Sequence, residues 1–199
     1  MNEKSEDKQY LYTGDIVVAG CAGEKGTDLI LKIKKEELLK KFNSSCLSLY
    51  KSRADIYEKL SEDIIIKACG SCLKSADIIK ADEGGILGAL FKYACDNDCG
   101  MRIRLKAIPI TQLTVEICEY YKLNPYRLLS SLYIIFCKDS YSIIDSLESA
   151  GICTAKIGIL CTDREKLIVD KENIEYINRL AKDEIYKLGA DIEKIKGDF

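Results

Sequence analysis

The stretch Glu83-Gly-Gly-Ile-Leu-Gly-Ala-Leu90 decides the fold, because its two leading glycines separate a predicted strand from a predicted helix. Residues 76–81 before it form the predicted strand. After it, apolar residues recur at helical spacing as far as Ala94, and the helix should end near Gly100. The chain therefore contains a strand–turn–helix unit of the kind from which helix-covered sheets are built.

Further strands and helices are predicted on both sides of this unit. Upstream, the pattern predicts a strand at 15–19, a helix from about Thr27, two helices within 34–62 separated at 43–45, and a helix to about 74 that is capped by Ser61. Downstream, it predicts a strand at 101–107, a helix at 111–121, a short turn or helix starting at 124–125, a strand at 133–137 and a helix at 140–150 that is capped by Ser140. The last elements are a hairpin of strands 153–160 and 166–169 around Thr162-Asp163-Arg164, and a helix at about 176–188.

This order of elements predicts an α+β domain, an α/β mixed sheet with packed helices in which crossovers produce parallel strand pairs. With 199 residues, of which 47% are hydrophobic, we expect a polar leader at 1–13 and a single domain at 14–199.

Composition excludes several classes of function. Thirty basic residues are interleaved with 32 acidic ones, so we expect no nucleic-acid partner. Apolar runs are too short to cross a membrane, and residues 1–9 are unlike a signal peptide, so we expect a cytoplasmic protein with no membrane association. The sequence contains no histidine, which excludes Ser-His and Cys-His catalysis and every histidine metal ligand.

Four segments resemble the C-terminal domain of the aminoimidazole ribotide (AIR) synthase-related and hydrogenase expression-formation (maturation) factor superfamily. The glycine motif at 83–90 is similar to the motif that opens that domain. The other three segments are 22–27, which resembles a glycine turn of the family, 108–131, and Asp183-Glu-Ile-Tyr-Lys187. The resemblance spans about residues 14–188 and implies an AIR synthase C-terminal-domain-like fold.

The resemblance also implies a function. Full members of this superfamily are dimeric ATP-dependent enzymes whose N-terminal domain supplies most nucleotide and Mg²⁺ ligands. We expect this chain to lack that domain and to be a ligand-binding or accessory subunit without complete catalysis of its own. By this reading it binds no cofactor alone, and ATP with Mg²⁺ only if a partner ATP-binding domain is present. Its partners would be that ATP-binding subunit, a small-molecule ligand, or a second copy of itself.

The chain departs from the family pattern at two places near the implied site. Lys80 stands where the family has Asp, and Asp82 stands where it has Thr. A cation in place of an anion disfavours Mg²⁺ there, although it would attract a phosphate or carboxylate. Leu132 follows Ser130 and Ser131 where the family usually has Gly, and its side chain narrows the space for a ligand.

The candidate ligand-binding residues are Lys80, Asp82, Gly84, Gly85, Gly23, Gly26, Thr27, Ser130 and Ser131. Glycines at a helix start expose backbone N–H groups that bind anions. A plain turn explains Gly23 and Gly26 better, because their spacing matches no phosphate-binding motif. For Gly84 and Gly85 both readings stay open.

The cysteines suggest an alternative function, a thiol-based metal-binding or redox protein. Cys69 and Cys72 form a C-x-x-C motif, and Cys95 and Cys99 could complete a four-thiolate site. The simpler reading is that these cysteines are reduced and pack as small apolar residues.

Overall fold

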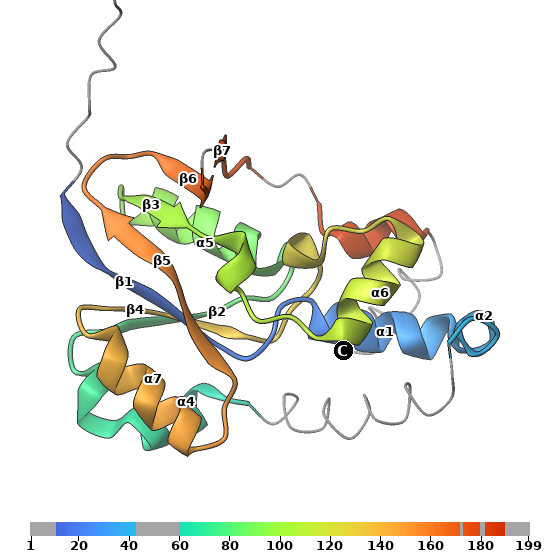
Figure 1. The fold of residues 1–199 in the computed structure, drawn as a ribbon, viewed down its shortest axis with the longest axis horizontal. Coiled ribbons are helices and arrows are strands. Elements are labelled where there is room, and N and C mark those ends of the chain that lie inside the picture. Colours follow the sequence, from blue (N-terminus) through green and yellow to red (C-terminus); the bar gives the residue numbers. More distant parts are fainter. Residues whose placement is uncertain (1–10, 43–59, 172, 180–181, 190–199) are drawn as a thin grey trace, which may run out of the picture.

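A seven-stranded mixed sheet with helices on both faces forms the body of the molecule (Figure 1). The computed structural model describes residues 11–42, 60–171, 173–179 and 182–189. The strands lie in the order β2-β4-β1-β5-β3-β6-β7. Their bounds are β1 Tyr12–Ala19, β2 Asp77–Lys80, β3 Gly100–Ile103, β4 Tyr133–Cys137, β5 Thr154–Cys161, β6 Lys166–Asp170 and β7 Asn173–Tyr176. This architecture confirms the predicted fold class.

The described α-helices alternate with the strands. They are α1 Glu24–Ile33, α2 Lys35–Leu39, α4 Glu62–Cys69, α5 Gly85–Asp96, α6 Gln112–Tyr121 and α7 Ser140–Ser149. Short 3₁₀ turns occupy Gly70–Leu73, Leu105–Ala107, Pro125–Arg127 and Glu184–Leu188. None of the described helices is long and apolar enough to cross a membrane.

Several helices begin at the residues that the sequence predicted, and polar side chains cap them. The Ser61 hydroxyl accepts a hydrogen bond from the Ile64 N–H, and the Thr111 hydroxyl accepts one from the Thr114 N–H. Helix α7 begins where expected, but its cap is Asp139, whose carboxylate accepts from two backbone N–H groups of the first turn. The break predicted at 43–45 and the second helix expected before residue 60 lie outside the described residues.

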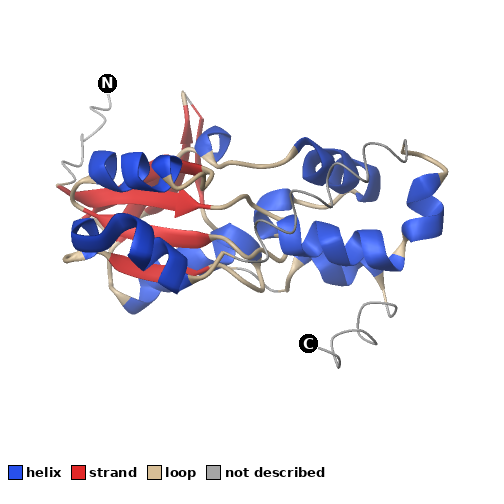
Figure 2. Cartoon of the chain, turned by 90° about the horizontal axis from the view of Figure 1, so that it is seen from below, coloured by secondary structure: helices blue, strands red, loops and turns tan. Residues whose placement is uncertain are grey.

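Three apolar clusters divide the interior. Helix α5 covers one face of the sheet, where its Ile86, Leu87, Leu90 and Ala94 pack on residues of β1, β3 and β4. Helices α4 and α7 cover the other face, over β1 and β4. The third cluster joins α1, α2 and α6 beyond the end of the sheet. Figure 2 shows this helical part extending away from the strands.

The predicted hairpin between residues 153–160 and 166–169 is wrong. Both strands form, as β5 and β6, but β3 lies between them, antiparallel to β5 and parallel to β6. Arg102 in β3 forms an ion pair with Asp163 in the β5–β6 connection, its Nη2 lying 2.5 Å from Oδ2. A turn signal alone does not reveal that a third strand enters the gap.

Three further predictions need correction. Instead of a helix at about 176–188 the structure has β7, which ends at Tyr176, and the 3₁₀ turn Glu184–Leu188. The strand expected at 101–107 stops at Ile103, where the 3₁₀ turn Leu105–Ala107 begins. Crossovers suggested several parallel pairs, yet among the described strands only β3 and β6 pair in parallel.

Candidate functional site

The two glycine turns predicted from the sequence meet at one segment, residues 125–132. Gly23 precedes α1 with φ of 72°, and its N–H donates to Ser130 Oγ at 2.9 Å. The Gly26 N–H donates to the carbonyl oxygen of Leu129 at 2.8 Å. A Cβ at Gly26 would lie 2.4 Å from Leu128 Cγ, so glycine is required here for the helix to approach this segment.

The turn before α5 contacts the same segment from the other side. Gly85 has φ of 62°, and a Cβ there would lie 2.6 Å from the carbonyl oxygen of Tyr126. The Ser130 N–H donates to the Asp82 carbonyl oxygen at 3.3 Å. Both helix N-termini are therefore held against residues 125–132 by backbone contact.

Thr27 completes this buried arrangement from α1. Its hydroxyl donates to the Gly23 carbonyl oxygen at 2.9 Å, and Thr114 Oγ1 lies within hydrogen-bond distance of it at 3.0 Å. Thr114 is within 2.8 Å of the Thr111 hydroxyl. Thr27 and Thr114 are fully buried, so this hydroxyl chain joins α1 to α6 inside the protein.

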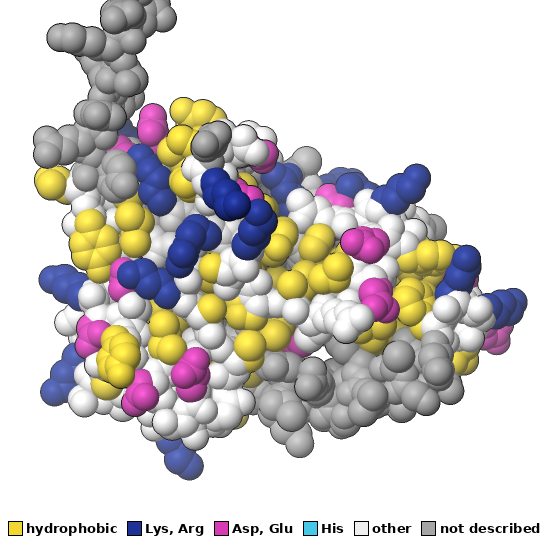
Figure 3. All heavy atoms as spheres, in the orientation of Figure 1, with side chains coloured by type: hydrophobic (Ala, Val, Ile, Leu, Met, Phe, Trp, Pro, Cys, Tyr) yellow, Lys and Arg dark blue, Asp and Glu magenta, His cyan; other side chains and the backbone are white. Residues whose placement is uncertain are grey.

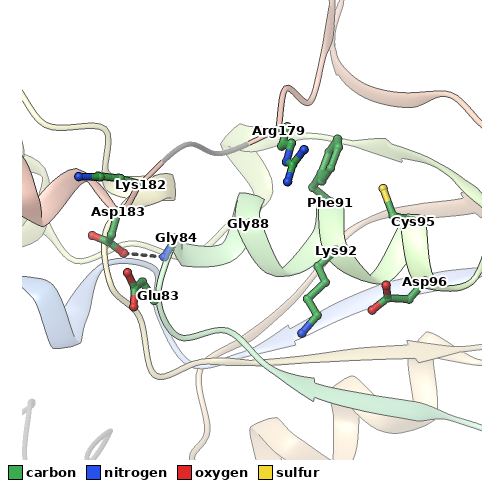
Figure 4. A pocket seen from close by; sticks show the side chains of 10 residues that line it. All are labelled: Glu83, Gly84, Gly88, Phe91, Lys92, Cys95, Asp96, Arg179, Lys182 and Asp183. Carbon is green, nitrogen blue, oxygen red and sulfur yellow. Dashed lines mark hydrogen bonds between the residues drawn. The ribbon is translucent and has the colours of Figure 1, made fainter.

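The carboxylate of Asp183 accepts a hydrogen bond at the N-terminus of α5, a role that the sequence did not reveal. This carboxylate accepts hydrogen bonds from the N–H groups of Gly84 at 2.6 Å (Figure 4), Leu129 at 3.2 Å and Ile185 at 2.9 Å. Asp183 is only 3% exposed. Burial raises the pKa of Asp183 above its usual value, although these three N–H groups act in the opposite direction. The carboxylate occupies the place where a helix N-terminus would bind an external anion.

The nine predicted ligand-binding residues divide into two groups. Six of them are buried in the internal contacts just described: Gly23, Gly26, Thr27, Gly84, Gly85 and Ser130. The other three reach the surface to different degrees: Lys80 and Asp82 are exposed, and Ser131 is half-buried. Asp82 Oδ1 forms an ion pair with Lys25 Nζ at 3.1 Å. Leu132 is buried among apolar side chains of the α5 face of the sheet.

Glu24, in the first turn of α1, is a buried acidic residue that the sequence analysis did not single out. It is 4% exposed. Desolvation by burial, together with the nearby Cys153, raises the pKa of Glu24 to about 8. A carboxyl group of this kind is protonated over part of the neutral range.

The four cysteines of the alternative site lie in pairs on opposite faces of the sheet. Cys69 packs in the cluster beneath α4 and α7, whereas Cys99 packs against the cluster beneath α5. Burial raises the pKa of both thiols. Within the part of the chain that the structure describes, no group of three or more Cys, Asp or Glu side chains is close enough to hold a metal ion. Nothing in the structure supports the thiol alternative.

The surface drawn in Figure 3 carries Lys and Arg side chains above β3 and β5. Lysines of β5 and of the 3₁₀ turn after β3 form ion pairs with acidic residues. Lys156 Nζ lies 2.5 Å from Asp15 Oδ1, and Lys106 Nζ lies 2.6 Å from Asp170 Oδ2.

Comparison with known proteins finds likeness at the level of structure. No family model and no curated protein matches the sequence. A crystal structure of HypE from E. coli, a hydrogenase maturation protein, superposes with a TM-score of 0.65 at 16% identity over 87% of this chain. Thiamine-monophosphate kinase from Stenotrophomonas maltophilia superposes with a TM-score of 0.55 at 15% identity over 80% of this chain.

The chain has the AIR synthase-like fold of HypE and thiamine-monophosphate kinase. It spans 52% of the length of the HypE chain and 51% of that of the kinase. A further HypE structure, determined in complex with ATP, superposes with a TM-score of 0.68 at 12% identity. At these identities the shared property is the fold.

Proposed function

We propose that this chain is a cytoplasmic AIR synthase-related, C-terminal-like domain that binds a small ligand or supports an ATP-binding domain, and that it does not complete ATP-dependent catalysis by itself. The observation that carries this proposal is the match to about half of each HypE and kinase chain. In this proposal, the nucleotide and Mg²⁺ are bound mainly by a partner domain, in the same or a separate polypeptide.

The hydrogen bonds around the glycine turns are consistent with a nucleotide site that lies mainly on a partner domain. The backbone N–H groups of Gly23, Gly26 and Gly84 donate to acceptors within the protein. They therefore stabilise the scaffold instead of forming a phosphate loop. The exposed Lys80 and Asp82 lie beside this scaffold, at the end of β2, and are candidates for contact with a ligand or partner.

Calorimetry with ATP and Mg²⁺ tests the proposal directly. The isolated chain should bind ATP weakly and show no turnover, whereas the HypE protein whose structure was determined in complex with ATP, measured in parallel, serves as the positive control for binding. Tight binding with turnover by the isolated chain would contradict the proposal.

Purification of the tagged chain from its native cell tests for the partner. We expect an ATP-binding protein to come with the chain in a stoichiometric amount, and Lys80→Glu with Asp82→Lys should reduce its recovery if this surface makes contact. A matched control reverses the charges of the Lys106–Asp170 pair, which lies on a different surface. If the wild-type chain purifies without an ATP-binding protein and no such domain belongs to its own polypeptide, the partner part of the proposal fails.

A further inference from the structure

Strand β7 forms one edge of the sheet, and among the described residues no strand pairs with the side of β7 that faces away from β6. β7 is antiparallel to β6, and just beyond it the Ile177 N–H donates to the Lys166 carbonyl oxygen at 2.8 Å. The backbone groups of successive residues point to alternate sides of a strand, so those of Ile174 and Tyr176 point away from β6. A further strand can therefore form hydrogen bonds with these two residues.

The face of this edge that lies opposite α5 is apolar. Ile174 and Tyr176 are each 62% exposed, and the register places Val169 and Leu167 of β6 opposite them on the same face. Helices α4 and α7 cover β1 and β4 on this side, and none of the described α-helices lies over β6 and β7 there. Figure 3 shows hydrophobic side chains at this end of the face. An added strand with apolar side chains on this face would extend the apolar surface of β6 and β7.

Charged residues lie in the middle of β7 and beyond both of its ends. Glu175 stands between Ile174 and Tyr176, and its side chain lies on the other face of the strand. Lys171 precedes β7 and Arg179 follows it, and all three charged residues are exposed. None of the three forms an ion pair with any residue in the described ranges. Along the edge the charges are therefore positive, negative and positive.

This order of charges opposes pairing between two copies of the chain. In a two-fold antiparallel pair that joins Ile174 of one copy to Tyr176 of the other, Glu175 lies opposite the same residue of the other copy. Lys171 of one copy is then brought toward Arg179 of the other. Like charges opposite one another destabilise a strand pair, whereas opposite charges stabilise it. The edge is thus suited to a different strand, one whose charges are negative, positive and negative.

We propose that the β7 edge, residues 173–176, binds an extended segment of another protein as an additional strand. The segment runs antiparallel to β7 and carries a basic residue opposite Glu175. Its apolar residues lie opposite Ile174 and Tyr176, and its acidic residues lie near Lys171 and Arg179. In this mode of recognition main-chain hydrogen bonds supply affinity and alternate side chains supply specificity. The proposal goes beyond the proposed function, since the segment need not belong to an ATP-binding domain.

A synthetic peptide tests the edge on the whole chain. The peptide Asp-Thr-Thr-Val-Lys-Val-Thr-Thr-Asp, labelled with fluorescein, has the complementary order of charges, and fluorescence anisotropy measures its binding. We expect saturable binding. A peptide with glutamate in place of the central lysine should bind about fivefold more weakly, because an attractive cross-strand pair becomes a repulsive one.

N-methylation of the peptide backbone shows whether a strand pair forms. The two valines lie opposite Ile174 and Tyr176, so N-methylation of either valine removes a hydrogen bond to β7 and should weaken binding roughly tenfold or more. The lysine lies opposite Glu175, and its N–H points away from β7. N-methylation of this lysine is therefore the matched control and should leave binding unchanged.

Exchange of the charge on the protein shows whether the peptide binds at β7. In Glu175→Lys the preference should reverse, so that the glutamate peptide binds about fivefold more tightly than the lysine peptide. Glu62→Lys, an exposed substitution on α4, is the control and should keep the wild-type preference.

Three results would overturn the proposal: no saturable binding of the lysine peptide at millimolar concentration, equal losses on N-methylation of valine and lysine, or an unchanged preference in Glu175→Lys. Dimers of the chain, detected by light scattering and dissociated by the lysine peptide, would assign the edge to a second copy and would also contradict it. None of these results bears on ATP binding by a partner domain. Conversely, ATP turnover by the isolated chain would contradict the proposed function and leave the β7 edge unaffected.

Discussion

At the scale of single residues, Asp183 makes the contact that sequence reasoning could least anticipate. Its neighbours predicted a helix, and only the folded chain brings its carboxylate to Gly84 and Leu129, 99 and 54 residues away. By contrast, the requirement for glycine at 84 and 85 was visible in the sequence. The identity of a residue predicts its local conformation, whereas its partner depends on the tertiary structure.

Replacing Asp183 by Ala should lower the free energy of unfolding by about 3 kcal/mol, because three backbone N–H groups, two of them in buried hydrogen bonds, lose a charged acceptor. Urea denaturation followed by circular dichroism measures this change. Asp183→Asn should cost less, because its amide oxygen still accepts.

The matched control is Asp82→Ala. It removes a carboxylate from an ion pair whose side chains are 38% and 56% exposed, so it should change stability by less than about 1 kcal/mol. Equal effects of the Asp183 and Asp82 substitutions would mean that Asp183 does not hold the start of α5.

Glu24 makes stability depend on pH in the neutral range. Its pKa is about 8 in the folded protein, above the ordinary value of 4.5, so the folded state retains a proton that the unfolded state releases. The contribution of Glu24 to the free energy of unfolding is therefore fully present below about pH 4.5. It is lost as the pH rises through 8. Glu24→Gln should remove this loss, about 3.5 kcal/mol between pH 5 and pH 8.

Urea denaturation of wild type and Glu24→Gln at several pH values gives the comparison. Glu37→Gln, an exposed substitution on α2, is the matched control and should follow the wild-type curve. Parallel curves for Glu24→Gln and wild type would show that Glu24 ionises in the folded protein as it does in the unfolded one.

At the scale of secondary structure, elements with strong local signals were predicted well. Helices α5, α6 and α7 each start at a glycine turn or a polar cap, and β4 is a continuous apolar run. Strand pairing was predicted poorly, because β3 and β6 pair residues that lie 65 positions apart and neither segment carries a local signal for this pairing. The prediction of a final helix was wrong because the start of that segment pairs with β6 as β7.

Gly85 tests whether α5 depends on its close approach to residues 125–132. In Gly85→Ala a new Cβ would meet two backbone carbonyl oxygens at 2.6 and 2.8 Å, and the residue would also sit at positive φ. We expect a loss of about 3 kcal/mol or more, measured by urea denaturation.

Gly151 separates backbone strain from this clash. It follows α7 with φ of 74° and has no neighbouring atom within 4 Å of a Cβ. Gly151→Ala should therefore cost only about 1–2 kcal/mol. Similar losses in the two variants would argue that strain alone, and not contact with residues 125–132, explains the glycine at 85.

At the scale of the whole molecule, residues 124–132 join the helical part to the sheet. Leu128 is fully buried in the cluster of α1, α2 and α6, yet the next residues contact Asp183 and the turn before α5. The Asn124 N–H donates to Glu184 Oε2 at 3.0 Å, which ties the same segment to the C-terminal turn. With one segment shared by both parts, the chain should unfold as a single cooperative unit.

The variant Leu128→Ala tests whether the chain unfolds as a single cooperative unit. The substitution removes a buried side chain that lies against Gly26 of α1, so the cavity should cost roughly 2–5 kcal/mol. Leu39→Ala on α2, where the side chain is 46% exposed, should change stability by about 0.5 kcal/mol or less. Hydrogen exchange followed by mass spectrometry should show Leu128→Ala raising the exchange of β4 amides together with those of α6. If exchange rises in α6 while β4 keeps its protection, the helical part unfolds independently of the sheet, and residues 124–132 do not couple them.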